Sequence, residues 1–242
     1  MAQSTVTAGL DEAAHRLIGG NRVLRYIPPD DLKALVRRSS LITVDAREAL
    51  FTQGDAGTDV LVVLQGYIKL SSTTVGGREA ILDIAGPGAV FGEIAVLNDW
   101  PRSASATALS PSRLLSISGA SFIQALLRAP EALLATVRLL SERLRTATEQ
   151  MTDAVDLPAP TRVAKALIYL AALHSSAADG GLRIEFQLSQ RELGGLTGLT
   201  RESINKHLAA FRDAGWIRMS GQDIAILNLA ALRQDIDARE LQ

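Results

Sequence analysis

The pattern of apolar and polar residues is β-like over the first half of the chain. From Leu41 to Ser118, short apolar runs such as VLVVLQGYIKL and EAILDI alternate with turns that contain glycine. No helical period runs through this segment. Many short strands separated by glycine turns are typical of a β-sandwich or jelly roll, and we predict one of these two folds here.

The pattern becomes helical after Glu131. Apolar residues then recur at alternating spacings of four and three: Leu133, Val137, Leu140, Leu144, Ala147, Met151 and Ala154. This heptad spacing predicts one long helix with a narrow apolar seam. A helix packed on its own β domain would also need an apolar stripe. The strict alternation gives a narrower face than such packing usually shows, so we favour a parallel dimer helix.

The helical pattern is interrupted at Asp156–Pro160, where two prolines lie two positions apart. Because neither proline can continue a helix, we expect a hinge there. Thr161 is the predicted N-cap of a helix through Leu173, followed by the turn-rich segment HSSAADGG and the strand LRIEFQL. The predicted domains are residues 1–130, 131–155 and 156–242.

Two short capped helices follow the strand. Ser189, with Glu192 three residues later, has the spacing of a capping box and opens the helix QRELGGL. Thr197 and Gly198 form a turn, and Thr200 caps a second helix, RESINKHLAAFRDAG. This arrangement predicts a helix-turn-helix, and WIRMSGQDIAIL predicts two strands of a wing around a glycine turn.

The second helix of this pair carries polar side chains near its N-terminal end: Arg201, Glu202, Asn205 and Lys206. Arginine can donate twice to guanine, glutamate can accept from the cytosine amino group, and lysine can reach guanine or a phosphate. A solvated charged helix face would explain this composition, but not the caps, the turn and the polar cluster together. The motif therefore favours sequence-specific binding to double-stranded DNA.

A second polar cluster lies in the segment FGEIAVLNDWPRSASA, residues 91–106. Gly92 would let backbone N–H groups approach a ligand, while Glu93 could accept a hydrogen bond from a sugar hydroxyl. Arg102 and Ser103, nine residues on, could hold a phosphate. These groups suit a cyclic nucleotide, which has one phosphate and one free ribose hydroxyl. The alternative is a salt bridge between Glu93 and Arg102 on a turn.

Composition excludes several other classes of protein. The chain has 242 residues, 47% of them hydrophobic, and a formal net charge of −1, which permits one large or two modest domains with hydrophobic cores. It has no cysteine, which excludes disulfides, cysteine-ligated clusters and thiol catalysis. The first twenty residues lack the pattern of a signal peptide, and no apolar run approaches the roughly 20 residues that span a bilayer. We expect a cytoplasmic protein with no membrane partner.

In this order, the residue 91–106 cluster, the long helix, the hinge and the helix-turn-helix resemble the Crp/Fnr family of bacterial transcription regulators, and within it the cAMP receptor proteins. The resemblance extends from about Tyr26 to Leu227. It implies an α+β chain with an N-terminal β jelly-roll cyclic-nucleotide-binding domain, a long dimerisation helix and a C-terminal winged helix-turn-helix domain. It also implies a homodimer that binds a near-palindromic operator and works with RNA polymerase. Its allosteric ligand would be cAMP, or alternatively cGMP, with no metal.

The resemblance assigns a role to each residue of the nucleotide site. The family's phosphate-binding cassette matches Gly92, Glu93, Ile94, Ala95, Arg102 and Ser103. Glu93 would bind the ribose 2′-hydroxyl, Arg102 and Ser103 would bind the cyclic phosphate, and Arg143 would reach the ligand from the long helix. The family places two hydroxyl residues at the base, where this chain has Ala147 and Thr148. The Thr148 hydroxyl can donate and accept, so it does not choose between adenine and guanine.

The resemblance also assigns DNA contacts. Arg201 and Glu202 match the family's base-reading pair, and Asn205 lies on the same helix. Lys206 stands where the cAMP receptor protein has arginine, so the bidentate fork is lost at that position. The expected phosphate contacts are Ser189, Gln190 and Thr200.

Two other functions are weighed against this prediction. A regulator of the same fold that binds DNA without a nucleotide would be expected to lack the chemistry of Glu93 or Arg102, and both residues are present. A cupin-type enzyme shares the jelly-roll pattern but needs clustered histidine and carboxylate ligands. No histidine lies between Leu41 and Ser118, so we expect no enzyme and no catalytic residues. Haem binding is disfavoured because the chain's histidines, His15, His174 and His207, are widely scattered.

Overall fold

The computed structural model describes residues 4–5, 10–74, 76–178 and 180–240. Its internal contacts divide the chain into two compact units. The first unit comprises Met1–Ser72 and Asp83–Arg145, and the second comprises Thr73–Leu82 and Thr146–Gln242. In the described part of the chain, no helix has both the length and the apolar character needed to cross a membrane.

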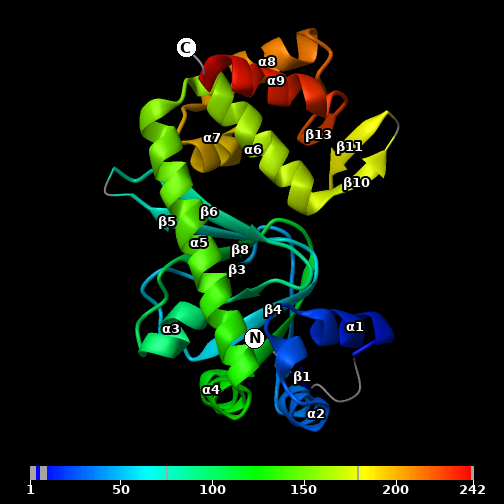
Figure 1. Cartoon of the computed structure of the whole chain (residues 1–242), viewed down its shortest axis with the longest axis vertical. Coiled ribbons are helices and arrows are strands. Elements are labelled where there is room, and N and C mark those ends of the chain that lie inside the picture. The colour runs from blue at the N-terminus through cyan, green and yellow to red at the C-terminus, as the bar shows by residue number, and fades with distance from the viewer. Residues whose placement is uncertain (1–3, 6–9, 75, 179, 241–242) are drawn as a thin grey trace. The chain divides into compact units, whose positions relative to one another are not determined.

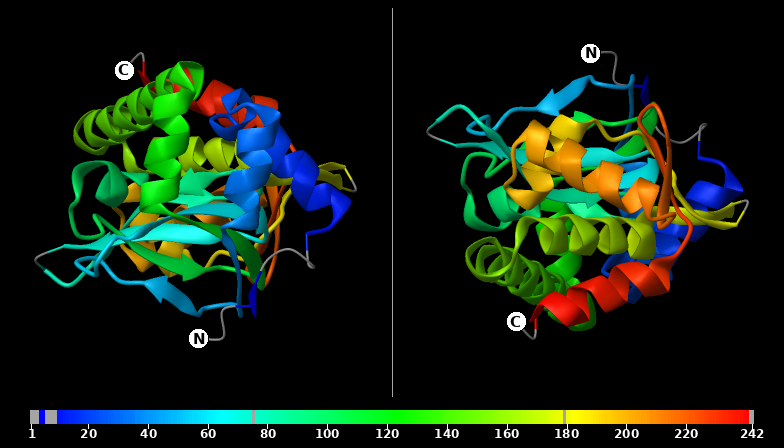
Figure 2. Two further views of the ribbon diagram at one scale, coloured as in Figure 1. Left: turned by 90° about the horizontal axis from the view of Figure 1, so that it is seen from below. Right: turned by 90° about the horizontal axis from the view of Figure 1, so that it is seen from above.

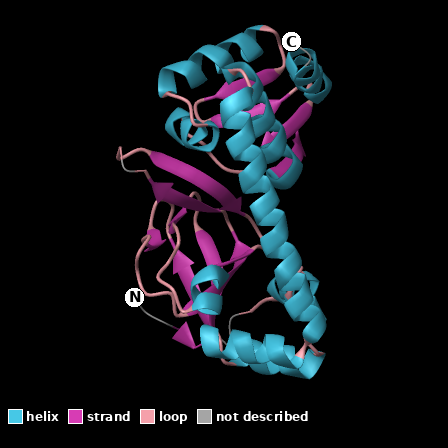
Figure 3. Cartoon of the chain, turned by 60° about the vertical axis from the view of Figure 1, so that its left-hand side comes forward, coloured by secondary structure: helices cyan, strands magenta, loops and turns pink. Residues whose placement is uncertain are grey.

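Two β-sheets, drawn among the magenta arrows in Figure 3, make up most of the first unit, although residues 79–82 of strand β6 are assigned to the second unit. One sheet has the strand order β1-β2-β9-β4-β7, and the other has the order β3-β8-β5-β6. The strands are β1 (Ser4–Thr5), β2 (Ser40–Val44), β3 (Ala49–Phe51), β4 (Asp59–Gln65), β5 (Ile68–Thr73), β6 (Glu79–Ala85), β7 (Val90–Phe91), β8 (Ser105–Ala108) and β9 (Ser112–Ser118). This architecture confirms the β-rich N-terminal domain predicted from the glycine-punctuated runs.

Strand β4 explains why that part of the sequence reads as a continuous apolar run. Successive side chains of a strand point to opposite faces. Val60 and Val62 pack against helices in one core cluster, while Leu61 and Val63 belong to a second cluster with residues of the other sheet. Because both faces of β4 are buried, polar residues do not alternate along it.

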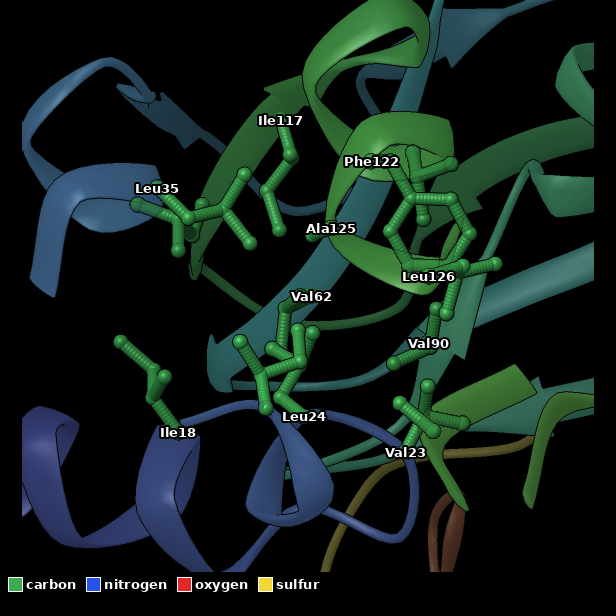
Figure 4. Close-up of a cluster of buried hydrophobic side chains, with 14 of the residues drawn as sticks. Ile18, Val23, Leu24, Leu35, Val62, Val90, Ile117, Phe122, Ala125 and Leu126 are labelled. Carbon is green, nitrogen blue, oxygen red and sulfur yellow. The ribbon is translucent and has the colours of Figure 1, made fainter. Parts of the chain in front are cut away.

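Short helices cover the first sheet at the Val62 face. They are α1 (Glu12–Gly20), the 3₁₀ helix η2 (Leu24–Tyr26), α2 (Pro29–Arg37), α3 (Glu93–Asn98) and α4 (Gly119–Arg128). Figure 4 shows Ile18, Leu24, Phe122 and Leu126 from these helices converging on Val62 of β4. This core fixes β4 and the β7–α3 turn, which supply the polar residues described below.

Helix α5 (Pro130–Asp156) confirms the predicted long helix, as a continuous element of 27 residues. One face is buried within the chain at Ala132, Ala135 and Thr136. The predicted heptad seam lies on another face, where Leu144 is 70% exposed and Met151 is 73% exposed. Within the first unit, the seam residue Leu144 is thus largely exposed rather than buried against the β strands.

The second unit contains the predicted winged helix-turn-helix (Figure 1). Its sheet has the strand order β10-β11-β13-β12, and helix α6 lies beside α9 (Figure 2, right). The elements are α6 (Ala159–His174), β10 (Ser175–Ala178), β11 (Gly181–Ile184), α7 (Gln190–Thr197), α8 (Arg201–Asp213), β12 (Ile217–Ser220), β13 (Asp223–Ile226) and α9 (Leu229–Glu240). Strands β12 and β13 pair around a turn at Gly221, as predicted for the wing.

Three local predictions in this unit are wrong. Helix α6 begins at Ala159 rather than after a Thr161 cap, because Pro160 falls in the first turn, where a missing N–H costs no hydrogen bond. The segment HSSAADGG was expected to be a turn, but its described part contains β10, which pairs with β11. The strand predicted as LRIEFQL is shorter, because β11 ends at Ile184. Asp179, within the predicted turn, lies outside the described residues.

Candidate functional site

A glycine turn begins the candidate nucleotide site. Strand β7 ends at Phe91 and helix α3 begins at Glu93, and Gly92 between them has a φ of 86°. This is the left-handed region, which favours glycine. A Cβ atom at position 92 would lie 2.5 Å from Nη1 of Arg102 and 3.1 Å from the carbonyl oxygen of Asp59. The left-handed turn therefore favours glycine, and a side chain at position 92 would require the Arg102 guanidinium to shift.

Glu93 presents one carboxylate oxygen that has no partner. The residue is 1% exposed, and its Oε1 accepts a hydrogen bond of 2.5 Å from Nη1 of Arg143. Its Oε2 is buried without a hydrogen-bond partner among the residues that the structure describes. A buried carboxylate oxygen is costly unless a donor reaches it. Glu93 is thus prepared to accept a hydrogen bond from a ligand hydroxyl.

Arg143 reaches this position from helix α5. Its Nη1 donates to Glu93, and its Nη2 donates to the carbonyl oxygen of Val90 at 2.6 Å. The two bonds hold the guanidinium against the β7–α3 turn and compensate the buried charge of Glu93. The position of Arg143 agrees with the sequence analysis, while its contact with a ligand remains a prediction.

Arg102 is the second buried cation of the site, and it is 4% exposed. Its Nη2 pairs with the Oδ1 carboxylate oxygen of Asp59, while its Nη1 donates to the carbonyl oxygens of Asp59 (2.8 Å) and Gly92 (3.2 Å). The guanidinium carbon lies 4.2 Å from the ring centroid of Phe51, a cation–π contact. The Nε atom is buried and has no partner among the described residues.

The alternative of a salt bridge between Glu93 and Arg102 is not what the structure contains. Glu93 pairs with Arg143, and Arg102 pairs with Asp59. Sequence reasoning missed Asp59, whose Oδ2 also accepts a 2.5 Å hydrogen bond from the Ser116 hydroxyl. The available signal was a carboxylate at the start of a strand that is otherwise buried on both faces, where an ion requires a partner.

The other predicted nucleotide contacts differ in their exposure to solvent and in the unit to which they belong. Ser103 is exposed and follows Arg102 directly, while Ile94 is partly buried and Ala95 is buried in the first turn of α3. Thr148 is an exposed residue of α5, and it belongs to the second unit. The structure thus brings Gly92, Glu93, Arg102 and Arg143 together within the first unit.

The helix-turn-helix has the predicted caps. Ser189 Oγ accepts from the backbone N–H of Glu192, and the Glu192 carboxylate accepts from the backbone N–H of Ser189, which completes the capping box. Gly198 ends α7 with a φ of 69°. Thr200 caps α8 by accepting from the backbone N–H of Ser203 at 3.2 Å. The sequence prediction of this motif is confirmed in its local detail.

Helix α8 has a buried apolar face and an exposed polar face. Ile204, Leu208 and Phe211 are buried. The exposed residues include the four that were predicted to read bases: Arg201, Glu202, Asn205 and Lys206. Nε of Arg201 lies 3.4 Å from Oε1 of Gln190, so a residue expected to contact phosphate also touches a predicted base reader.

No group of three or more histidine, aspartate or glutamate side chains in the described residues could hold a metal ion. The two polar clusters described above are Glu93, Arg102 and Arg143 with Asp59 in the first unit, and the exposed polar face of α8 in the second.

Two segments of the chain match families of known proteins. Residues 41–129 match the family model of the cyclic nucleotide-binding domain, and residues 161–235 match that of the Crp-like helix-turn-helix domain. The CRP-like cAMP-activated global transcriptional regulator of Mycobacterium tuberculosis is 30% identical over 204 residues, which cover 84% of this chain and 91% of the relative. The chain belongs to the Crp/Fnr family.

A second curated relative and a solved structure are also similar to the chain. The cyclic AMP receptor protein of Thermus thermophilus is 32% identical over 185 residues, which cover 76% of this chain and 82% of the relative. The solved structure of FixK2 from Bradyrhizobium japonicum covers 81% of this chain and 96% of its own, with a TM-score of 0.71 and 22% identity. At that identity the FixK2 structure supports the fold alone. As a family member, the chain is a DNA-binding transcription regulator that contains a cyclic nucleotide-binding domain.

Proposed function

We propose that this Crp/Fnr family regulator is a homodimer whose binding to operator DNA is controlled by cAMP. The observation that carries the proposal is the buried Oε2 of Glu93, which has no hydrogen-bond partner among the described residues. A ribose 2′-hydroxyl would supply the missing donor. A regulator that needs no nucleotide would have no reason to keep this oxygen buried and unpaired.

The groups around Glu93 suit the rest of a cyclic nucleotide. Arg102 provides a buried positive charge whose Nε has no hydrogen-bond partner in the described part of the chain, and the exposed Ser103 follows it directly. Arginine and hydroxyl groups together bind a phosphate through charge-assisted hydrogen bonds. The main-chain N–H groups of Ile94 and Ala95 lie in the first turn of α3, where they have no partner within the helix. Arg143 would support the ribose contact by holding Glu93.

The base of the nucleotide is inferred from the relatives, because the predicted base contact Thr148 does not distinguish adenine from guanine. Thr148 can donate or accept, so it serves adenine and guanine equally well. The relatives from Mycobacterium tuberculosis and Thermus thermophilus are described as cAMP-activated and as a cyclic AMP receptor, which supports cAMP. We therefore propose cAMP first and cGMP as the second candidate.

The DNA-bound form would be a dimer with two copies of α8. The exposed apolar seam of α5 suits a parallel partner helix, because Leu144 and Met151 would otherwise remain in water. A two-fold dimer presents two reading helices, so the operator would be near-palindromic with half-sites about one helical turn apart. RNA polymerase is the expected protein partner of such a regulator.

One observation favours the alternative of a nucleotide-independent regulator. Arg102 already has an internal counter-ion in Asp59, so the protein does not need a phosphate to compensate that buried charge. Glu93 Oε2 and Arg102 Nε, which have no hydrogen-bond partner within the described ranges of the chain, argue in the other direction. Calorimetry can separate the two functions.

The test is titration of the purified protein with cAMP and with cGMP. We expect saturable binding of cAMP, with weaker binding of cGMP. Arg102→Gln should cost about 2 to 5 kcal/mol of nucleotide affinity, because it removes the buried positive charge that faces the phosphate. Arg128→Gln is the matched control, since its side chain is 68% exposed on α4.

Each outcome of the titration has one meaning. Binding that is lost in Arg102→Gln and kept in Arg128→Gln supports the site. Equal affinity in Arg102→Gln and the wild type would remove Arg102 from the site. No heat change with either nucleotide, in a protein that binds DNA, would favour the nucleotide-independent regulator.

A further inference from the structure

Asp59 is the carboxylate that pairs with Arg102, the arginine proposed to bind the cyclic phosphate. Its side chain is 26% exposed, and its two oxygens bind Arg102 and Ser116. The carbonyl oxygen of Asp59 accepts a further bond from Arg102. Asp59 is therefore built into the strand beside the predicted phosphate-binding arginine.

The hydrogen bonds of Arg102 limit what it can offer to a ligand. A guanidinium has five N–H donors. The two carbonyl oxygens of Asp59 and Gly92 accept from Nη1, and the Asp59 carboxylate accepts from Nη2. The Nε–H and one Nη2–H remain for a phosphate. Arg102 can thus bind a ligand without leaving Asp59, but only with a negative carboxylate close to the incoming negative phosphate.

The charges of Asp59, Arg102 and the incoming phosphate determine how this arrangement affects nucleotide affinity. A buried arginine requires a counter-charge, and Asp59 supplies it when no nucleotide is bound. When a nucleotide binds, two anions share one cation, and their repulsion in a partly buried site is poorly screened. The repulsion lowers the affinity for the phosphate without altering the contacts of Glu93.

We propose that Asp59 is an internal counter-ion of Arg102 that competes with the cyclic phosphate and sets the nucleotide concentration at which the regulator responds. The inference rests on the proposed nucleotide-binding function. It assigns to Asp59 a role in tuning affinity, whereas Glu93 and Arg102 provide the contacts themselves.

The decisive variant is Asp59→Asn. The amide oxygen can still accept from Arg102 and the amide nitrogen can donate to Ser116, so the geometry is kept while the charge is removed. We expect cAMP to bind at least about tenfold more tightly in calorimetry, because the competing anion is gone. Asp59→Thr is a second variant that removes the charge, since threonine suits a strand and its hydroxyl can accept from Arg102.

Asp99→Asn is the matched control. Asp99 is exposed, lies three residues before Arg102 and has a left-handed backbone that asparagine tolerates. The substitution removes a carboxylate charge close to Arg102 in the sequence and leaves the ion pair of Arg102 with Asp59 intact. We expect its cAMP affinity to stay within about twofold of the wild type, because an exposed charge is screened by solvent.

The outcomes separate the inference from the function on which it rests. Tighter binding in both Asp59 variants but not in Asp99→Asn supports competition, including the case in which the wild type binds too weakly to measure. Wild-type binding that is unchanged or weakened in both Asp59 variants would overturn the counter-ion role and leave the nucleotide function intact. No binding by the wild type or by either folded Asp59 variant would overturn both proposals.

Discussion

Gly92 is the residue on which the geometry of the site most depends. It combines a left-handed backbone with the close approach of the Arg102 guanidinium, and a side chain would conflict with both. The glycine therefore serves the position of the arginine as well as the turn into α3. Gly54 is also left-handed, at a φ of 94°, but it has open space where its Cβ would be.

The pair Gly92 and Gly54 gives a matched test. Gly54→Ala should cost about 1 to 2 kcal/mol of unfolding free energy through its backbone conformation alone. Gly92→Ala should cost more and should also weaken cAMP binding, because the Cβ atom displaces Arg102. The measurements are urea unfolding and calorimetry on both variants. Equal losses of stability together with unchanged cAMP affinity would show that the close approach at Gly92 is unimportant.

The composition of the nucleotide site was more predictable than its internal pairing. Glu93, Arg102 and Arg143 were named from the sequence, but the ion pairs that they form, Arg102 with Asp59 and Arg143 with Glu93, were not predicted. Asp59 is 43 residues before Arg102, and strand pairing brings the two together. Local spacing carries no information on such a contact, because it depends on which strands become neighbours.

Helix α5 shows how an element can serve two surfaces. Ala132, Ala135 and Arg143 face the chain's own structure, whereas the seam residues Leu144 and Met151 are exposed. An apolar seam that is exposed in one chain is the expected surface for a second helix. The nucleotide contact and the dimer contact would thus lie on different faces of one helix.

Leu144→Glu tests the seam. A charge placed between two packed helices would lose solvation worth several kcal/mol per ion, so we expect the dimer to dissociate. Thr152→Glu is the control, because Thr152 is an exposed residue of the same helix outside the seam. Light scattering coupled to size-exclusion chromatography should give a monomer for the first variant and a dimer for the second. A dimeric Leu144→Glu would place the interface elsewhere.

Caps and periodicity predicted most elements of the second unit, but not their limits. The capping box at Ser189 and the Thr200 cap were found because their hydrogen bonds join residues three positions apart. Strand β10 was missed because its small residues, Ser175–Ala178, resemble a turn and become a strand only by pairing with β11. Hydrogen bonds between residues three positions apart can be predicted from the sequence, whereas the pairing of a strand depends on which strand becomes its neighbour.

In the whole molecule, the proposed nucleotide contacts Glu93 and Arg102 and the helix-turn-helix lie in different compact units, which helix α5 links along the chain. Arg143 lies in the first unit and Thr148 in the second. A ligand that favours one arrangement of α5 would shift the population of the DNA-binding form, and the break between Asp156 and Ala159 offers a place for movement. Ligand control thus requires a coupling free energy between the units.

That coupling is measured most directly as the affinity for DNA with and without cAMP. The duplex would be one that the protein selects from a random library in the presence of cAMP, and the salt concentration would be held constant. We expect saturating cAMP to tighten binding by about 5- to 150-fold, the usual range for allosteric coupling, and Arg102→Gln to lose this effect while keeping its basal DNA affinity. Equal dissociation constants with and without cAMP in a nucleotide-binding wild type would contradict cyclic-nucleotide control of this regulator.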